Sequence, residues 1–163
     1  MSFMLMAEEP VDCRAPLDLA FVLDITGSMG STLNNLKASI SSIAADASVK
    51  SNNNYRLALI TVDESSTGSI NIIRQEFSQN NLTSFQAAIN AVTLGGGNGI
   101  PEPTDLGIES VLNGELGAFR SNAIKMIVMI TDALPSGGND QYTVGVDDVK
   151  VQTLANIAAS QGV

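Results

Sequence analysis

The hydrophobic and polar positions of this chain follow two periods in turn, one typical of strands and one typical of helices. Apolar runs predict strands over 17–23, 55–62, about 70–77 and 124–131, of which the first and last read as buried on both faces. Apolar residues at helical spacing, with cap and stop signals, predict helices over about 31–47, 83–92, 104–112 and 148–160. Strands that alternate with helices predict an α/β fold: a three-layer, doubly wound (Rossmann-like), mainly parallel sheet with helices on both faces.

The sequence also predicts the N-caps of two helices and the side chains that two helices bury. Thr83, with Gln86 three residues later, is the expected N-cap of the second helix, and Asp147 is that of the last. The side chains expected to face inward are Leu33, Leu36, Ile40, Ile43 and Ala47 in the first helix and Phe85, Ala88, Ile89 and Val92 in the second.

The order of the strands can also be anticipated. The second and third strands are close in sequence, with 63–69 between them as a polar loop, so we expect an antiparallel hairpin and one antiparallel edge strand. If the second and fourth strands lie on opposite sides of the first, the strand order reverses between Asp24 and Asp132. Doubly wound sheets bind ligands at such a reversal, beyond the carboxyl ends of the strands.

Oxygen-bearing side chains stand at this point of the sequence. Asp24, Thr26 and Ser28 alternate along an extended stretch after the first strand, so their side chains can line one side, and Gly27 lets the loop curl. Asp132 directly follows the fourth strand. Carboxylate and hydroxyl oxygens are ligands that Mg²⁺ and Mn²⁺ prefer.

A segment rich in glycine and proline, GGGNGIPEP at 95–103, precludes regular structure before the third helix. It holds Glu102, which reads either as a further ligand or as a solvated acid. Thr104 reads as a helix N-cap or as a ligand. Asp63 and Asp105 read as solvated acids or as neighbours of the ligands.

Composition narrows the classes of function. The 163 residues carry a net charge of −9 and no histidine, which argues against nucleic-acid binding and excludes a Ser-His-Asp triad. Cys13 is the only cysteine, so zinc is disfavoured and an internal disulfide is excluded. No apolar stretch reaches the roughly 18 residues of a membrane span, and residues 1–7 make a poor secretory signal. The content of Asn, Ser, Thr and Gly is typical of an extracellular or cell-surface protein, although a cytoplasmic location stays open.

Two motifs, DITGSM at 24–29 and ITDA at 130–133, resemble those of a von Willebrand factor type A domain with a metal-ion-dependent adhesion site. Pro101-Glu102 resembles the integrin beta-subunit version of the ligand loop. The resemblance covers 17–163 and leaves 1–16 as an N-terminal arm. It implies that the metal ligands are Asp24, Thr26, Ser28, Glu102 and Asp132, that Mg²⁺ or Mn²⁺ is bound, with Ca²⁺ also compatible, and that there is no catalytic residue.

The chain also departs from the integrin beta pattern. Ser31 and Thr32 stand where that version has two acids, so the neighbouring calcium site is expected to be absent. The third metal site of that version would need Asn98, but the spacing between Asn98 and Glu102 does not match the integrin beta pattern. Whether Asn98 or Thr104 joins the metal site stays open.

The resemblance implies a module in which the bound cation recruits an Asp or Glu side chain of a partner protein, rather than an enzyme. One alternative is a structural assembly module of a multi-subunit surface or filament complex. A more remote alternative is a phosphoaspartyl hydrolase, because DITGS is close to the DKTGT of phosphorylated ATPases. That chemistry needs a lysine near the phosphate, and Lys125 is predicted at the opposite end of the sheet.

The sheet is expected to be incomplete. Relatives continue beyond the last helix with another strand, and without it the fourth strand would expose an apolar edge, which natural proteins avoid. The missing strand could come from residues 2–7, from a neighbouring copy, from a separate polypeptide, or from the rest of a longer protein.

Overall fold

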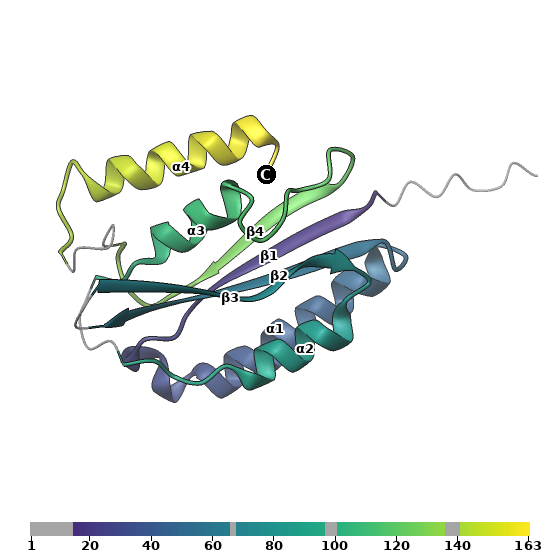
Figure 1. Ribbon diagram of the computed structural model, residues 1–163, viewed down its shortest axis with the longest axis horizontal. Coiled ribbons are helices and arrows are strands. Elements are labelled where there is room, and N and C mark those ends of the chain that lie inside the picture. The colour runs from purple at the N-terminus through teal and green to yellow at the C-terminus, as the bar shows by residue number, and fades with distance from the viewer. Residues whose placement is uncertain (1–14, 66–67, 97–100, 136–140) are drawn as a thin grey trace, which may run out of the picture.

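The computed structural model describes residues 15–65, 68–96, 101–135 and 141–163. Within these residues, four strands form one sheet in the order β3-β2-β1-β4 (Figure 1). β1 pairs in parallel with β2 and with β4, and β2 pairs with β3 as an antiparallel hairpin. The strands are β1 (Leu17–Asp24), β2 (Tyr55–Ser65), β3 (Gly68–Gln79) and β4 (Ile124–Ile130). The expected α/β fold is confirmed, and the strand order reverses between β1 and β4 as predicted.

Helices cover both faces of the sheet. α1 (Leu33–Lys50) and α2 (Leu82–Ala91) lie on one face, and α3 (Thr104–Leu112) and α4 (Asp147–Gln161) lie on the other (Figure 1). Because side chains alternate along a strand, β1 contributes to two cores. Phe21 and Leu23 pack in the core that contains Phe85 of α2, and Val22 packs in the core that contains Val111 of α3. No helix in the described ranges has the length and apolarity needed to cross a membrane.

The third helix lies unusually close to the sheet. A Cβ added to Gly107 in α3 would lie 2.5 Å from Val22 Cγ1 and 2.7 Å from Val62 Cγ1. Such a distance is shorter than a van der Waals contact, so only glycine allows α3 to rest on β1 and β2 here. This contact holds α3 close to β1 and β2 near the carboxyl ends of these strands.

The polar loop expected over 63–69 is wrong for 63–65 and 68–69, which belong to strands, while 66–67 lie outside the described residues. β2 runs to Ser65 and β3 begins at Gly68, with Asp63 paired to Ile70 and Glu64 to Ser69. Polar side chains suggested a loop, but strand pairing is made by backbone groups. The hairpin ladder therefore continues through polar positions.

Some helix details also differ from expectation. Asp147 is the first residue of α4 rather than its N-cap, although its Oδ2 accepts a hydrogen bond from the Thr143 amide at 2.6 Å. In α1, Ala44 is buried while Ile43 is 46% exposed, because the buried stripe follows Ile40, Ala44 and Ala47. The predicted inward residues of the second helix pack in the core as expected.

The second helix begins differently from the predicted cap. α2 starts at Leu82, so Thr83 lies inside the helix, exposed, and is not the N-cap. The Asn81 side chain bonds β2 instead: its Oδ1 accepts from the Leu57 amide at 2.9 Å, and its Nδ2 donates to the Leu57 carbonyl at 2.8 Å. The pairing register of β2 and β3 shifts directly after Leu57, so the Asn81 side chain bonds the backbone of β2 beside this irregularity.

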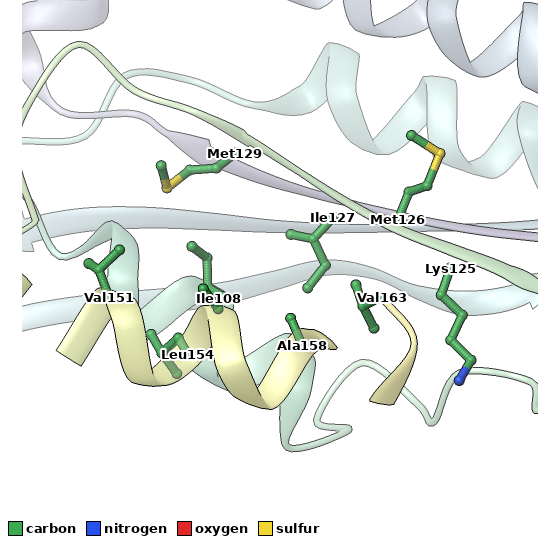
Figure 2. Close-up of a pocket in the computed structure, with 10 residues that line it drawn as sticks. Ile108, Lys125, Met126, Ile127, Met129, Val151, Leu154, Ala158 and Val163 are labelled. Atoms are coloured by element: carbon green, nitrogen blue, oxygen red, sulfur yellow. The ribbon is translucent and has the colours of Figure 1, made fainter. Parts of the chain in front are cut away.

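The fourth strand has a neighbour on one side only within the described part of the chain. Its side chains are half-buried or exposed rather than buried on both faces as predicted, because it forms the edge of the sheet. In Figure 2, Ile127 points toward Leu154 and Ala158 of α4, while Met126 points to the opposite face. A hollow of about 400 Å³ lies between β4 and α4. This edge agrees with the expected incomplete sheet, whereas residues 2–7 and Cys13 lie outside the described residues.

Candidate metal centre

The structure brings the five predicted ligands to the carboxyl ends of β1 and β4. Asp24, the last residue of β1, is fully buried and held at both oxygens. Its Oδ1 accepts hydrogen bonds from the Thr26 amide at 2.9 Å and the Thr26 hydroxyl at 2.7 Å. Its Oδ2 accepts from the Thr131 hydroxyl at 2.8 Å. The carboxylate of Asp24 is therefore fixed in one orientation.

Thr131 is a site residue that the sequence interpretation missed. The parallel register pairs Leu23 with Ile130, so the next residue of each strand brings Thr131 beside Asp24. The ITDA motif contains Thr131, but its position beside Asp24 could be predicted only with the pairing register of β1 and β4.

Ser28 links the first loop to the fourth strand. Its hydroxyl donates to Asp132 Oδ1 at 2.9 Å, and its Oγ lies 3.3 Å from Thr26 Oγ1. Each hydroxyl has one proton, and both protons are committed to carboxylates, to Asp24 and to Asp132. The lone pairs of two neighbouring hydroxyl oxygens are thus left for another partner. Ser28 and Asp132 are exposed, so this side of the centre opens to solvent.

The first loop is held in place by its own backbone. The Ile25 amide donates to the Val62 carbonyl of β2, and the Ile25 carbonyl accepts from the Gly95 amide at 2.7 Å. A short 3₁₀ helix, η1 (Gly27–Ser31), follows, and its Met29 is buried in the protein. The buried Met29 side chain anchors the turn that carries Thr26 and Ser28.

Glu102 is buried, and little in the described part of the chain compensates its charge. Its amide donates to the Leu134 carbonyl at 2.8 Å, and it forms an isolated parallel bridge with Pro135. Its side chain is 0% exposed, and neither carboxylate oxygen has a hydrogen-bond partner among the described residues. Buried carboxylates are normally hydrogen-bonded or paired with a cation. The sequence alternative of a solvated acid is therefore wrong.

The electrostatic environment of Glu102 reflects that burial. Burial raises the pKa of this carboxyl from its usual value near 4.5 to about 7; the neighbouring Thr26 hydroxyl opposes the rise, and the charges of Asp24, Glu64 and Asp63 add to it. A cation at this position would favour the charged form instead.

The remaining candidates have other surroundings. Thr104 is buried and its amide donates to the Glu102 carbonyl at 2.9 Å, but the N-cap of α3 is Pro103. Asp105 is buried and pairs with Lys150 of α4 at 2.9 Å, so it is not a solvated acid. Asp63 is half-buried, and its Oδ2 accepts from the Gly96 amide at 3.3 Å. Asn98 lies outside the described residues.

The donor set suits a hard cation only with the help of hydroxyl groups. In the ranges that the structure describes, no group of three or more His, Cys, Asp or Glu side chains could hold a metal ion by itself. The hydroxyls of Thr26 and Ser28 and the unpartnered oxygens of Glu102 complete the set with Asp24 and Asp132. All are oxygen donors of the kind that Mg²⁺ and Mn²⁺ take, so these residues fit such an ion.

The hydrolase alternative would need a lysine near Asp24, and Lys125, the lysine considered for that role, lies away from it. Lys125 pairs in register with Asp18, at the far end of the sheet from Asp24. Its Nζ donates to the Gln161 carbonyl.

Solved structures share this fold. The vWF domain of the type V pili tip protein Mfa5 from Porphyromonas gingivalis matches with a TM-score of 0.60 and 22% identity, over 75% of this chain and 39% of that one. A structure of three N-terminal domains of the same protein matches with a TM-score of 0.60 and 20% identity, over 89% of this chain and 27% of that one. The pilus adhesin SpaC from Lactobacillus rhamnosus GG, in an open conformation, matches with a TM-score of 0.54 and 20% identity, over 74% and 15%.

These chains are longer than the present one, which spans less than half of each. No curated protein sequence is significantly similar. The model of one protein family matches residues 18–163, which is nearly the whole chain and includes every candidate ligand. With that match and the shared fold, the chain belongs to the von Willebrand factor type A domain family.

Proposed function

We propose that this domain is a protein-interaction module that uses a bound Mg²⁺ or Mn²⁺ to recruit an acidic side chain of a partner protein. The observation that carries the proposal is Glu102, whose two buried oxygens have no hydrogen-bond partner in the described ranges and lie beside the fixed carboxylate of Asp24. An isolated buried carboxylate is costly unless a cation compensates it.

The buried and the exposed ligands would bind different sides of the ion. Asp24 and Glu102 are fully buried and would hold the inner side of the ion, while the hydroxyls of Thr26 and Ser28 would supply neutral oxygens. Ser28 and Asp132 are exposed, so the outer side would stay open to a partner. The ion would supply a local positive charge on a domain whose net charge is −9, and a partner carboxylate would be attracted to it.

Several observations support an adhesive role at the cell surface. Two of the similar structures are of a pili tip protein and one is of a pilus adhesin. We infer an extracellular or cell-surface location and no enzymatic role for this domain. The assembly-module alternative is favoured by β4, which has a strand neighbour on one side only among the described residues and could pair with another polypeptide without any metal.

Thermal unfolding with and without metal tests the proposal. The melting temperature is measured in EDTA, Mg²⁺, Mn²⁺ and Ca²⁺ for the parent, Ser28→Ala and Asp24→Ala. An ion at 100 times its dissociation constant adds about 2.7 kcal/mol to the free energy of unfolding. We expect this rise in the parent, a smaller one in Ser28→Ala and none in Asp24→Ala.

Ser31→Ala is the matched control, because Ser31 is an exposed hydroxyl of the same short helix and is not a proposed ligand. It should respond to metal as the parent does. If the parent shows no rise with any of the three ions at millimolar concentration, the metal-dependent proposal is wrong and the assembly module becomes the better explanation.

A further inference from the structure

Two exposed leucines stand beside the candidate metal centre, one from each face of the sheet. Leu94 follows α2 and is 43% exposed, and Leu134 follows β4 and is 55% exposed. Large apolar side chains of this kind are unremarkable when scattered singly over a surface. Backbone hydrogen bonds of Leu134 and of Gly95, the residue after Leu94, connect both positions to the loops that carry the proposed ligands.

Leu94 is fixed against the first ligand loop. A Cβ added to Gly30 would lie 3.2 Å from Leu94 Cδ1, so the leucine side chain rests on the loop just after Ser28. The next residue, Gly95, donates its amide to the Ile25 carbonyl at 2.7 Å. Leu94 therefore keeps its place beside Thr26 and Ser28.

Leu134 is fixed on the other side. It lies two residues after Asp132, and its carbonyl accepts from the Glu102 amide at 2.8 Å. It lines a hollow of about 290 Å³ beside α4, together with the apolar or aromatic Pro135, Tyr142, Val151 and Ala155 and the polar Asp148 and Gln152. An apolar side chain next to a recruited carboxylate can enter this hollow.

Charge around the centre limits the partner further. The acids Asp63, Glu64 and Asp132 lie in or beside the ligand loops. Among the described residues, basic side chains of the adjoining elements already have partners. Lys37 donates to the Asn90 carbonyl at 3.1 Å, Arg74 donates to the Thr61 hydroxyl at 2.9 Å, and Lys150 pairs with Asp105 and Glu109. A second acid on the partner would meet the like charge of these carboxylates.

We propose that Leu94 and Leu134 select a partner segment in which one acidic residue is flanked by apolar residues. The proposal rests on the proposed function, because the acid must be recruited by the ion. The leucines make contact with the neighbours of that acid, and the surrounding carboxylates reject additional acids.

Three blocked peptides test the selection: acetyl-Leu-Asp-Leu-amide, acetyl-Ser-Asp-Ser-amide and acetyl-Glu-Asp-Glu-amide. Binding to the parent is measured by isothermal titration calorimetry in Mn²⁺, and again in EDTA. We expect the leucine peptide to bind roughly tenfold more tightly than the serine peptide, since partly buried leucine contacts are of that size, and the glutamate peptide to bind most weakly.

The variants are Leu94→Ser, Leu134→Ser and the double substitution, with Val49→Ser as control because Val49 is 71% exposed at the far end of α1. The measured quantity is the ratio of leucine-peptide to serine-peptide affinity within each variant, so a change in metal affinity cancels. The double variant should bring the ratio close to one, whereas Val49→Ser should keep the parent ratio.

Failure of this inference differs from failure of the proposed function. Equal binding of the three peptides to the parent, or an unchanged ratio in the double variant, would overturn selection by the leucines while metal-dependent recruitment stands. Binding that is as strong in EDTA as in Mn²⁺, or no binding of any peptide in Mn²⁺, would overturn both.

Discussion

In the absence of metal, the domain is expected to become less stable as the pH rises from 4.5 to about 7. The cause is Glu102, whose pKa is raised from 4.5 to about 7 in the folded protein, mainly by burial. Below pH 4.5 the carboxyl is protonated in both folded and unfolded chains, and its neutral form suits the buried position. As the pH rises, the unfolded chain releases the proton first, so the folded state loses on the order of 3 kcal/mol.

Urea unfolding in EDTA across pH 4 to 8 measures this loss. Glu102→Gln should remove it and should be more stable than the parent above pH 7, because a neutral amide replaces the buried charge. Glu115→Gln, a substitution of an exposed glutamate, should follow the parent. Saturating Mg²⁺ should flatten the profile of the parent. A Glu102→Gln profile as steep as that of the parent would contradict the assignment.

Asp18→Ala is expected to cost roughly 3 kcal/mol of stability at pH 7, because it breaks a buried ion cluster. Asp18 is fully buried in β1 and accepts from Arg56 Nε at 2.9 Å, from Arg120 Nε at 2.9 Å and from the Arg120 amide at 2.7 Å. Burial would raise the pKa of Asp18, but the hydrogen bonds from Arg56 and Arg120 outweigh it and hold the pKa below 3.8.

The midpoint of urea unfolding at pH 7 checks this cost, with Asp46→Ala as control because Asp46 is exposed on α1. The contribution of Asp18 is present above pH 3.8 and is lost as the pH falls through its lowered pKa, the reverse of the Glu102 effect. An Asp18→Ala midpoint within error of the Asp46→Ala midpoint would show that the cluster is not stabilising.

The fold was predictable because strong signals lay at the ends of elements. Apolar runs marked β1 and β4, and polar residues directly after them marked the edge where Asp24 and Asp132 meet. The parallel pairing of β1 with β2 and β4 then brings these residues together without further information. The same reasoning anticipated Glu102 only through the resemblance of Pro101-Glu102 to a known loop.

The features that could not be predicted depend on contacts between residues that are far apart in the sequence. Asp105 looked solvated because nothing in its neighbourhood of sequence shows that Lys150 will pair with it. Asp18 looked like part of an apolar strand because Arg56 and Arg120 come from distant segments. Gly107 passed unnoticed in a helix because its role is a close approach to Val22 and Val62. Each miss concerns a contact between residues far apart in the chain.

The central place of β1 has a consequence for hydrogen exchange. Its backbone is bonded to strands on both sides, and nearly all its residues are buried, so its central amides can exchange only when the whole domain unfolds. α4 differs, because Asp147 and Leu154 are its only buried residues, and its amides should exchange through local opening. The slowest amides of β1 therefore report the global free energy of unfolding. Any metal that binds the folded domain should slow them by the same factor by which it shifts that equilibrium.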